Sequence, residues 1–167
     1  MEKVAAYPGT FDPFTNGHLE IIERASKLFD KVVVLVAKRE EKNTLFTFNE
    51  RFEIVKDCVL HIPNVSVEKL DVLLVKYLRE HKIRFIVRGA RNVSDFEYEI
   101  QMFEMNLKMY SEIETVLLFP KENNRALSST LVKEIINNGG DVSMFIPEKA
   151  LLKLREKLER KEWKRAL

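Results

Sequence analysis

Short apolar segments alternate with longer amphipathic ones along the whole chain. The segment KVVVLVAK (31–38) is rich in β-branched residues and apolar throughout its centre, which is typical of a strand buried on both faces. Comparable segments complete a set of five predicted strands: 4–7, 31–38, 65–70, 83–89 and 113–120. Because a helical pattern follows each strand, the order favours right-handed crossovers and a parallel sheet with helices on both faces.

Helical periodicity fills the segments between these strands. Two helices are expected to begin at a capping box, one formed by Thr47 and Glu50 and the other by Ser94 and Glu97. The predicted helices are 17–29, 47–60, 73–81, 94–110, 128–140 and a last one from Pro147 to the end of the chain. Residues expected to face the core include Phe96, Ile100, Phe103 and Leu107 on 94–110, and Leu151, Leu154 and Leu158 on the last helix. Together the elements predict an α/β fold, a Rossmann-like doubly wound sheet of five parallel strands with helices at its C-terminal end.

Length and composition describe an ordinary globular protein. The chain has 167 residues, of which 46% are hydrophobic and 32% charged, so we expect one domain over residues 1–167. Its 28 basic and 26 acidic side chains leave a net charge of +2, which argues against broad nucleic-acid binding. The single cysteine, Cys58, excludes an internal disulfide framework, and we expect it to be a buried thiol. With no secretion signal and no apolar stretch of roughly 20 residues, we expect no membrane partner and a cytoplasmic location.

Polar residues gather where the predicted strands end. In a sheet of this kind, ligands bind outside the carboxyl ends of the strands, at the point where the strand order reverses. Helix N-termini bind phosphate, and arginine side chains match phosphate oxygens, so a polyanionic ligand is expected there. The residues concerned are Thr10 and His18 after the first strand, Lys38, Arg39 and Lys42 after the second, Arg88 and Arg91 after the fourth, and Lys121, Asn123, Asn124, Arg125 and 128–130 after the fifth.

Each of these signals has a purely structural alternative. A lone histidine at a helix start is often a structural group, cations after a strand can form a solvated loop, and the serines at 128–129 can be only a helix cap. Their coincidence at one edge of the sheet is what favours a ligand site. The sequence contains no Walker A motif, no G-x-G-x-x-G and no His/Cys cluster that would indicate a different chemistry.

Four motifs resemble those of a known enzyme family. YPGTFDPFTNGH (7–18) resembles the N-terminal signature of the nucleotidyltransferases related to class I aminoacyl-tRNA synthetases, and its last four residues match their T/H-x-G-H motif. LFTFNER (45–51), VRGARNVSDFEYEIQM (87–102) and SSTLVKEI (128–135) are similar to the phosphopantetheine adenylyltransferases, in the same order and at the same spacing. The resemblance extends to about Pro147.

The resemblance implies a reaction of coenzyme A biosynthesis. The phosphate of 4′-phosphopantetheine would attack the α-phosphorus of ATP directly, giving dephospho-coenzyme A and pyrophosphate without a covalent enzyme intermediate. A phosphate dianion is already a nucleophile, so positioning and preorganised donors should supply most of the catalysis. The resemblance also implies Mg²⁺ carried with ATP, no metal site of the protein's own, coenzyme A as a feedback ligand, and a homohexamer.

The same resemblance assigns roles residue by residue. Thr10 would orient the attacking phosphate, His18 would stabilise the transition state, and Lys42 would hold the incoming phosphate. Leu74 and Arg88 fall at positions that bind the pantetheine substrate, together with Thr10 and Lys42. The positions assigned to ATP are Thr10, Phe11, His18, Gly89, Ala90, Arg91, Glu99, Asn124, Arg125, Ala126, Leu127, Ser128, Ser129 and Thr130.

The sequence departs from the family pattern at two places. Ala90 stands where leucine is common, and Asn124, followed by Arg125, stands where many members carry an aromatic residue, so stacking from position 124 is absent. Two alternatives stay open: an adenylyltransferase or cytidylyltransferase of the same superfamily with a different acceptor, and a nucleotide-binding regulator without turnover. The joint presence of Lys42, Leu74 and the DFEYE segment (95–99) argues against the first, and intact Thr10, His18, Lys42 and Arg91 argue against the second.

Overall fold

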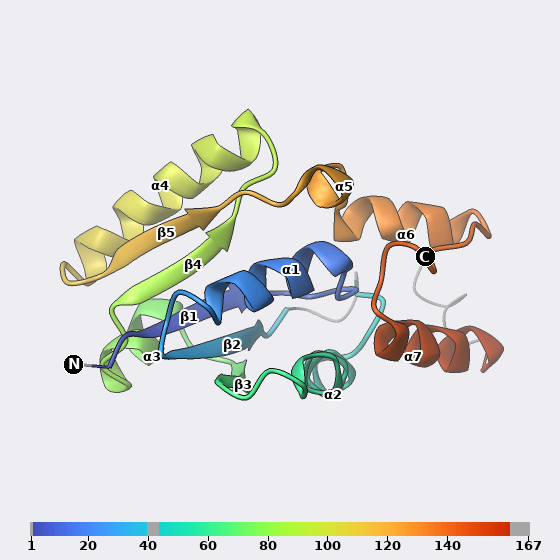
Figure 1. Cartoon of the computed structure of the whole chain (residues 1–167), viewed down its shortest axis with the longest axis horizontal. Coiled ribbons are helices and arrows are strands. Elements are labelled where there is room, and N and C mark those ends of the chain that lie inside the picture. The colour runs from blue at the N-terminus through green and yellow to red at the C-terminus, as the bar shows by residue number, and fades with distance from the viewer. Residues whose placement is uncertain (1, 40–43, 161–167) are drawn as a thin grey trace.

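The computed structural model describes residues 2–39 and 44–160. They form a sheet of five parallel strands: β1 Val4–Gly9, β2 Lys31–Ala37, β3 Val65–Leu70, β4 Phe85–Gly89 and β5 Glu114–Leu118. The helices are α1 Asn16–Ala25, α2 Phe48–Val59, α3 Leu74–Glu80, α4 Val93–Met109, α5 Glu122–Arg125, α6 Ser129–Asn137 and α7 Glu148–Glu159. Each strand is followed by a helix (Figure 1), as the sequence pattern predicts.

The strand order places the chain's first strand in the middle of the sheet. The order is β3-β2-β1-β4-β5, so the chain builds outward first on one side and then on the other. β1 pairs with β2 up to Gly9 and Val36, and its other edge pairs with β4. The predicted doubly wound sheet is therefore confirmed. Because the order reverses between β1 and β4, a ligand is expected at the carboxyl ends of these two strands.

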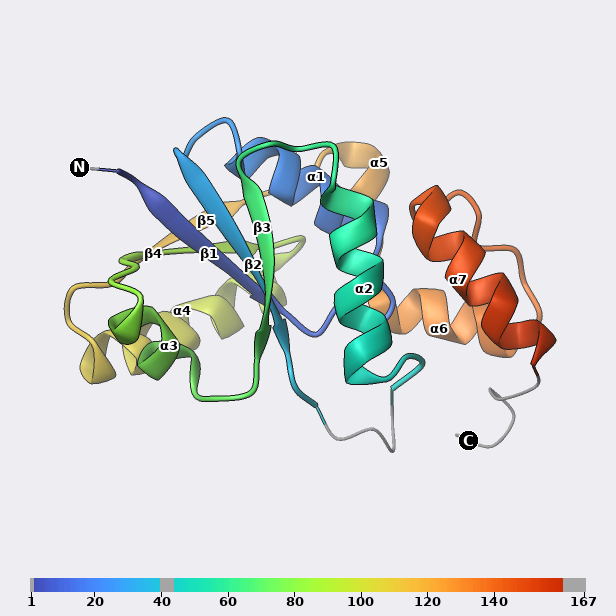
Figure 2. The ribbon, with the colours of Figure 1, turned by 90° about the horizontal axis from the view of Figure 1, so that it is seen from below.

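Alternate residues of the central strands enter two separate hydrophobic cores. Tyr7 and Val34 belong to the core formed with α1, α2, α6 and α7, whereas Ala6 and Leu35 belong to the core formed with α3. Figures 1 and 2 show helices on both sides of the sheet, with α7 beside α2. The centre of β2 is buried on both faces, which explains the uninterrupted apolar segment at 31–38.

Helix α4 begins differently from its prediction. Its N-cap is Asn92, whose side chain accepts the backbone N–H of Asp95, so the predicted capping box of Ser94 and Glu97 is wrong. Asn92 has the extended backbone of an N-cap and satisfies the first turn, and Ser94 is therefore already helical.

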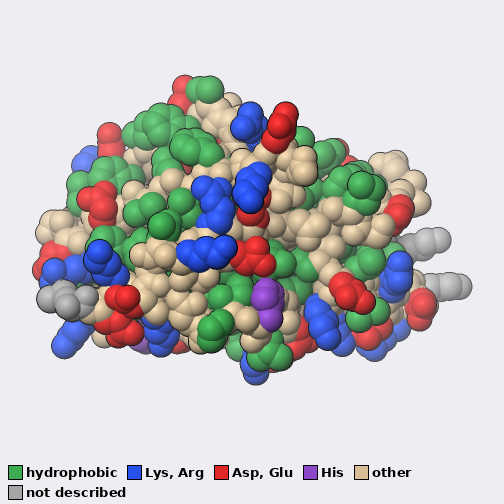
Figure 3. Space-filling view, in the orientation of Figure 1, with side chains coloured by type: hydrophobic (Ala, Val, Ile, Leu, Met, Phe, Trp, Pro, Cys, Tyr) green, Lys and Arg blue, Asp and Glu red, His purple; other side chains and the backbone are tan. Residues whose placement is uncertain are grey.

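Helix α4 also exposes apolar side chains that were expected in the core. Phe96 and Ile100 are 41% and 40% exposed, so their predicted core positions are wrong. The buried residues of this helix are Glu99 and Asn106. These two polar residues turn inward because they line cavities at the edge of the sheet, and hydrophobic side chains gather over α4 at the surface (Figure 3).

The C-terminal helix α7 packs against α2, and Lys157 Nζ lies 2.8 Å from a carboxylate oxygen of Glu50. Leu154 is buried as expected, but Leu158 is 41% exposed and its predicted inward position is wrong, because in this last turn it is the side chain of Lys157 that turns toward α2. Cys58 is a buried free thiol, as expected, and burial raises its pKa to about 11. Within residues 2–39 and 44–160, no helix is long and apolar enough to cross a membrane.

Candidate active site

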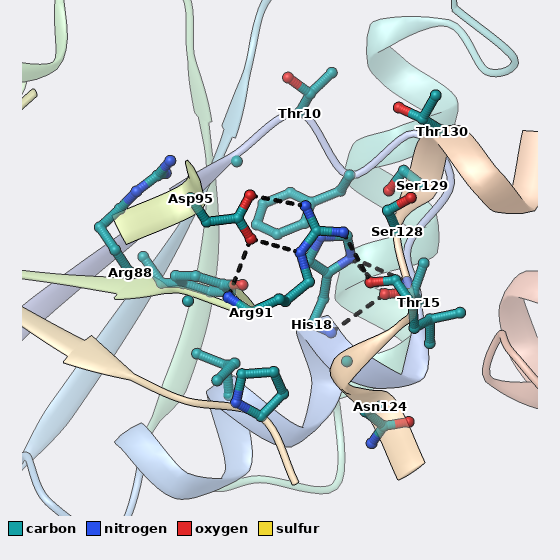
Figure 4. Close-up of a pocket in the computed structure, with 18 of the residues that line it drawn as sticks. Thr10, Thr15, His18, Arg88, Arg91, Asp95, Asn124, Ser128, Ser129 and Thr130 are labelled. Carbon is teal, nitrogen blue, oxygen red and sulfur yellow. Dashed lines mark hydrogen bonds and ion pairs between the residues drawn. The ribbon is translucent and has the colours of Figure 1, made fainter. Parts of the chain in front are cut away.

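A cavity of about 380 Å³ opens at the carboxyl ends of β1 and β4, where the strand order reverses. Its walls come from β1 and the turn after it, the start of α1, the end of β4, one face of α4 and parts of the segment 120–130. Figure 4 shows the side chains that converge on it. The residues predicted for this edge that line the cavity are Thr10, His18, Arg88, Arg91, Asn124, Ser128, Ser129 and Thr130.

The remaining predicted residues are distributed unevenly around this cavity. Of the positions that the family resemblance assigns to ATP, four more line it: Phe11, Gly89, Glu99 and Leu127. Ala90 is fully buried outside the lining, while Arg125 and Ala126 are exposed outside it. Lys38, Arg39, Lys121 and Asn123 also lie outside the lining. Lys42 lies outside the described residues, so its role stays a prediction.

The turn after β1 has an uncommon backbone conformation. Phe11 has φ +53°, in the left-handed region that costs a residue with a side chain roughly 1–2 kcal/mol. Its ring is buried between Tyr7 and Phe14, with ring centroids 5.6 and 5.7 Å away. A Cβ on Gly9 would lie 2.6 Å from this ring. Glycine at position 9 and the buried ring therefore fix together the turn that brings Thr10 to the cavity.

The imidazole of His18 is oriented by the backbone of its own helix cap. Thr15 is the N-cap of α1: its hydroxyl accepts the His18 N–H, and its own N–H donates to Nδ1 of His18 at 3.0 Å. A backbone N–H can only donate, so Nδ1 is unprotonated and the neutral ring carries its proton on Nε2. The ring packs against Phe11 and Phe14, with centroids 5.1 and 5.6 Å away.

The surroundings of His18 keep it uncharged. Burial lowers its pKa from 6.5 to about 4, and the positive charges of Arg91 and Arg88 act in the same direction. At physiological pH the ring is therefore neutral, with Nδ1 used by Thr15 and Nε2 protonated. Such a group acts as a hydrogen-bond donor rather than as a general base.

Arg88 is held by a buried carboxylate and a strand carbonyl. Its Nε lies 2.9 Å from both carboxylate oxygens of Glu99, its second terminal nitrogen lies 2.7 Å from one of them, and its first donates to the carbonyl of Pro8 at 2.7 Å. Burial acts to lower the pKa of Arg88, but the hydrogen bonds and charge of Glu99 outweigh it and the net shift is upward. Glu99 thus fixes Arg88 as a permanent cation at the end of β4.

Arg91 lies just before Asn92, the N-cap of α4, and reaches to the segment before α6 (Figure 4). Its Nε lies 2.8 Å from Asp95, with which it forms a bidentate pair, and it also donates to the carbonyl of Leu127 at 3.1 Å. Burial acts to raise the pKa of Asp95, but the hydrogen bonds and charge of Arg91 outweigh it and the pKa is lowered. The guanidinium is therefore held in place before any ligand arrives.

The N-terminus of α6 faces the same cavity. Ser128 caps the helix by accepting the Leu131 N–H at 3.0 Å, and the Ser129 hydroxyl donates to the carbonyl of Pro13 at 2.9 Å. The first N–H groups of a helix have no intrahelical partners, so those of Ser129 and Thr130 are available to an anion. The link to Pro13 holds this anion-binding end against the turn that carries Thr10.

The short helix α5, which the sequence pattern did not predict, is tied to α1 by one carboxylate. Glu20 accepts the backbone N–H of Lys121 at 2.9 Å and the side-chain amide of Asn124 at 2.7 Å. At position 124, where an aromatic residue could stack on a base, this chain therefore has an amide that is hydrogen-bonded to Glu20.

A second cavity of about 280 Å³ shares a wall with the first. The residues common to both are Pro8, Gly9, Thr10, Arg88, Tyr98 and Glu99. Beyond this wall the lining is mostly apolar, with Leu70, Leu74, Ile86, Met102 and Phe103, and it includes the buried amide of Asn106. Two ligands bound side by side would therefore meet at Thr10 and Arg88.

Sequence reasoning missed several residues that shape these cavities. Asp95 had a visible signal, because it lies four residues after Arg91. Thr15 was part of a quoted motif, but its contact with His18 depends on the helix cap that only the fold defines. Tyr98 lies in the quoted DFEYE segment (95–99), as Asp95 does, but it was given no role there. Asn106 gave no signal, because a polar residue on the inner face of α4 breaks the apolar pattern used to find that face.

Comparisons with known proteins agree with this architecture. The family model described as cytidylyltransferase-like matches residues 6–135. A phosphopantetheine adenylyltransferase of Campylobacter concisus (strain 13826) is 47% identical over 155 residues, which cover 93% of this chain and 99% of that protein. One of Azoarcus sp. (strain BH72) is 50% identical over 158 residues, covering 95% and 97%. The chain belongs to the phosphopantetheine adenylyltransferase family.

A solved structure gives the same fold at greater distance. A protein of Vibrio parahaemolyticus, provisionally named a nicotinate-nucleotide adenylyltransferase, has a TM-score of 0.72 at 21% identity, over 98% of each chain. At that identity the likeness concerns the fold alone. The name of the phosphopantetheine adenylyltransferase family describes a nucleotidyltransferase of coenzyme A biosynthesis, so the predicted enzyme class is confirmed. Within the described residues of this family member, no group of three His, Cys, Asp or Glu side chains could hold a metal.

Proposed function

We propose that the protein transfers the adenylyl group of ATP to 4′-phosphopantetheine, releasing dephospho-coenzyme A and pyrophosphate. The observation that carries the proposal is the pair of cavities that share Thr10 and Arg88, in a chain of the phosphopantetheine adenylyltransferase family. The larger cavity has the anion-binding features that a triphosphate needs, and the smaller one has the apolar lining that a pantetheine arm needs.

ATP is assigned to the larger cavity. Its triphosphate would lie between the N-terminus of α6, with Ser129 and Thr130, and the guanidinium of Arg91, because helix N–H groups and arginine both bind phosphate oxygens. Gly89 and Asn124 line the rest of this cavity, where the adenosine would lie. Mg²⁺ would arrive with ATP, held by the phosphates themselves and by water, as this hard cation prefers.

The acceptor is assigned to the smaller cavity. A pantetheine arm is an aliphatic chain that carries two amide groups, one hydroxyl and a terminal thiol, which matches mostly apolar walls that include Leu74 and a single buried amide, Asn106. The phosphate end would reach the shared wall at Thr10 and Arg88. Lys42, assigned by the resemblance alone, would add a second cation beside it.

Catalysis would then rest on positioning and on one directed donor. The acceptor phosphate at Thr10 would face the α-phosphorus of ATP in line with the departing pyrophosphate. The Nε2–H of His18 would donate to an α-phosphate oxygen as charge moves toward the leaving group. No side chain need take a proton or form a covalent bond, because the nucleophile is already ionised.

The direct test of the proposal is an assay with purified protein, ATP, Mg²⁺ and 4′-phosphopantetheine. Dephospho-coenzyme A and pyrophosphate should appear in equal amounts. Parallel assays with nicotinate mononucleotide as acceptor, or with CTP as donor, should give no product above background. Turnover only with one of those substrates, or none with any, would overturn the proposal in favour of another acceptor or of a binding protein.

Gly17→Ala should separate ligand binding from stability. A Cβ at this position would meet only ordinary contacts, 3.6 Å from the Thr15 hydroxyl and 3.9 Å from the Asn124 carbonyl, so the fold itself tolerates alanine. Alanine also favours helix by up to about 1 kcal/mol. We therefore expect an unchanged or higher Tm together with about tenfold weaker ATP binding by calorimetry, because the methyl group would occupy space on the cavity wall beside Asn124, where the adenosine is assigned. Unchanged ATP affinity would show that no ligand approaches this backbone.

Asn106→Leu should affect the acceptor alone. Replacing the amide with an apolar group of similar size leaves a pantetheine amide without its partner, so we expect KM for 4′-phosphopantetheine to rise about tenfold and ATP affinity to stay the same. Asn123→Leu is the matched control, because Asn123 is exposed outside both cavities. Equal effects of Asn106→Leu on the two substrates would contradict the assignment of the smaller cavity.

Three further properties are proposed from the resemblance. Coenzyme A, which contains the product's pantetheine and nucleotide parts, would compete at the two joined cavities as a feedback ligand. A homohexamer would cover part of the exposed apolar face of α4, where Val93, Phe96 and Ile100 lie. The protein would work in the cytoplasm on soluble substrates, with neither nucleic acid nor membrane as a partner.

A further inference from the structure

The largest fully buried side chain in the described part of the protein is an arginine. Arg51 lies on α2, is 0% exposed, and is not part of either cavity lining. One terminal nitrogen donates to the carbonyls of Thr10 and Ala37, at 2.7 and 2.8 Å, and its Nε donates to the carbonyl of Phe46 at 3.3 Å. Burying a charged group costs several kcal/mol, so this position needs an explanation beyond packing.

The carbonyls of Thr10 and Ala37 lie just beyond the paired part of β1 and β2. The register of these two strands ends at Gly9 and Val36; Thr10 follows the end of β1, and Ala37 is the last residue of β2 and pairs with Leu70 of β3. Arg51 bridges the carbonyls of Thr10 and Ala37 where this register ends. Both residues line the acceptor cavity, and Thr10 also lines the ATP cavity. The guanidinium lies outside both cavity linings and therefore fixes the distance between Thr10 and Ala37, two residues of the cavity walls.

A second buried charge, the carboxylate of Asp12, fixes the segment that carries the Phe46 carbonyl. Asp12, which is 3% exposed, accepts the N–H groups of Leu45 and Phe46 at 2.8 and 2.9 Å. Phe46 is thus fixed through its N–H by the turn after β1 and through its carbonyl by Arg51. A planar guanidinium with several donors can satisfy three carbonyls at fixed angles, which a lysine ammonium cannot reproduce.

We propose that Arg51 is a positioning residue for the acceptor: it fixes Thr10 and Ala37 so that the phosphate of the acceptor is aligned with the α-phosphorus of ATP. The inference rests on the proposed function. Its consequence is a split between the two substrates, because Ala37 lines the acceptor cavity alone, Thr10 lies on the shared wall, and Arg51 contacts none of the residues of α6 that are assigned to the triphosphate.

The test compares Arg51→Met and Arg51→Lys with Val55→Ala. Val55 lies one turn further along α2 and is fully buried, so its alanine variant weakens the packing of the same helix without touching the strand carbonyls. For Arg51→Met we expect kcat/KM for 4′-phosphopantetheine to fall about 10²-fold, with the Kd of ATP by calorimetry unchanged within about threefold. Arg51→Lys should show the same split with a smaller loss, and it serves alone if the methionine variant does not fold. Val55→Ala should lower Tm and leave both substrate parameters unchanged.

Three results would overturn the role of Arg51: equal losses for ATP and acceptor in either arginine variant, the same split in Val55→Ala, or wild-type acceptor kinetics in an arginine variant. If the proposed function itself is wrong, the wild-type protein will make no dephospho-coenzyme A. This result is separate from any effect of the Arg51 variants.

Discussion

His18→Ala is expected to lower kcat by about 10²–10³ while the Kd of ATP stays within about threefold of wild type. The Nε2–H of His18 is fixed by the Thr15 N–H on Nδ1, so it is ready to donate before the substrates bind. Its interaction strengthens as charge develops, and its removal should therefore cost turnover rather than ground-state binding. Rapid-quench kinetics and calorimetry on the same preparation give the two quantities.

Two controls separate this role from a structural one. His18→Asn and His18→Gln keep a donor and should recover part of kcat if the amide reaches the phosphate. Any loss of wild-type kcat near pH 6 should also appear in His18→Gln, because it comes from protonation of the acceptor phosphate, whose second pKa is about 6, and not from His18, whose pKa is about 4. A near-normal kcat in His18→Ala, or an acid loss that wild type shows and His18→Gln lacks, would contradict the assignment.

The lowered pKa of His18 should also make the free energy of unfolding depend on pH. The folded protein holds His18 neutral, whereas the unfolded chain binds a proton at the ordinary pKa of 6.5. The stabilisation from the neutral form is therefore fully present above pH 6.5 and is lost progressively as the pH falls toward 4. Urea unfolding at neutral and acidic pH should show a steeper loss for wild type than for His18→Gln.

Arg88→Met is expected to abolish measurable turnover and to lower the free energy of unfolding by about 3 kcal/mol. It leaves the Glu99 carboxylate buried without its partner, and it removes a cation from the wall that both cavities share. The estimate is at the low end of the range for breaking a buried pair, because 29% of the Arg88 side chain stays exposed. Urea unfolding and the product assay measure the two effects.

A double variant and a surface control complete this experiment. Arg88→Met combined with Glu99→Met removes both charges, so it should regain most of the lost stability and none of the activity. Arg84→Met breaks the exposed pair between Arg84 and Glu112, whose side chains are both about half exposed, and should change stability by less than about 1 kcal/mol. An active Arg88→Met variant, or an active double variant, would show that Arg88 is a purely structural residue.

The order of elements could be predicted from the sequence because each strand is short, apolar and followed by a helix. The centre of β2 is apolar without interruption and rich in β-branched residues, which predicts a strand covered on both faces. The parallel order then placed Thr10, His18 and Arg88 at one edge without any knowledge of their contacts. That part of the site follows from topology alone.

Helix α4 shows where such reasoning stops. Its pattern placed Phe96 and Ile100 in the core because apolar residues are usually buried, yet the helix turns Glu99 and Asn106 inward to line two cavities. A helix that serves a polar site on its inner face leaves apolar residues on its outer face. Pattern alone cannot distinguish that arrangement from an ordinary core helix.

The tautomer of His18 and the role of Arg51 were also beyond the sequence. The first depends on a backbone N–H that the helix cap brings to Nδ1, and the second on carbonyls of two strands that meet only in the folded sheet. The contact of His18 has the three-residue spacing of a capping box, but with histidine where glutamate or glutamine is usual, and the contacts of Arg51 span 41 and 14 residues. The residue types were visible, but their hydrogen-bond partners were not.

The adenylyl group should pass directly between ligands held in the two joined cavities. A single-turnover experiment with ATP labelled at the α-phosphorus, with and without 4′-phosphopantetheine, follows this transfer. Label should leave ATP only when the acceptor is present and should appear only in dephospho-coenzyme A, in step with pyrophosphate. Label bound to the protein, pyrophosphate released without acceptor, or no dephospho-coenzyme A at saturating substrates would contradict it.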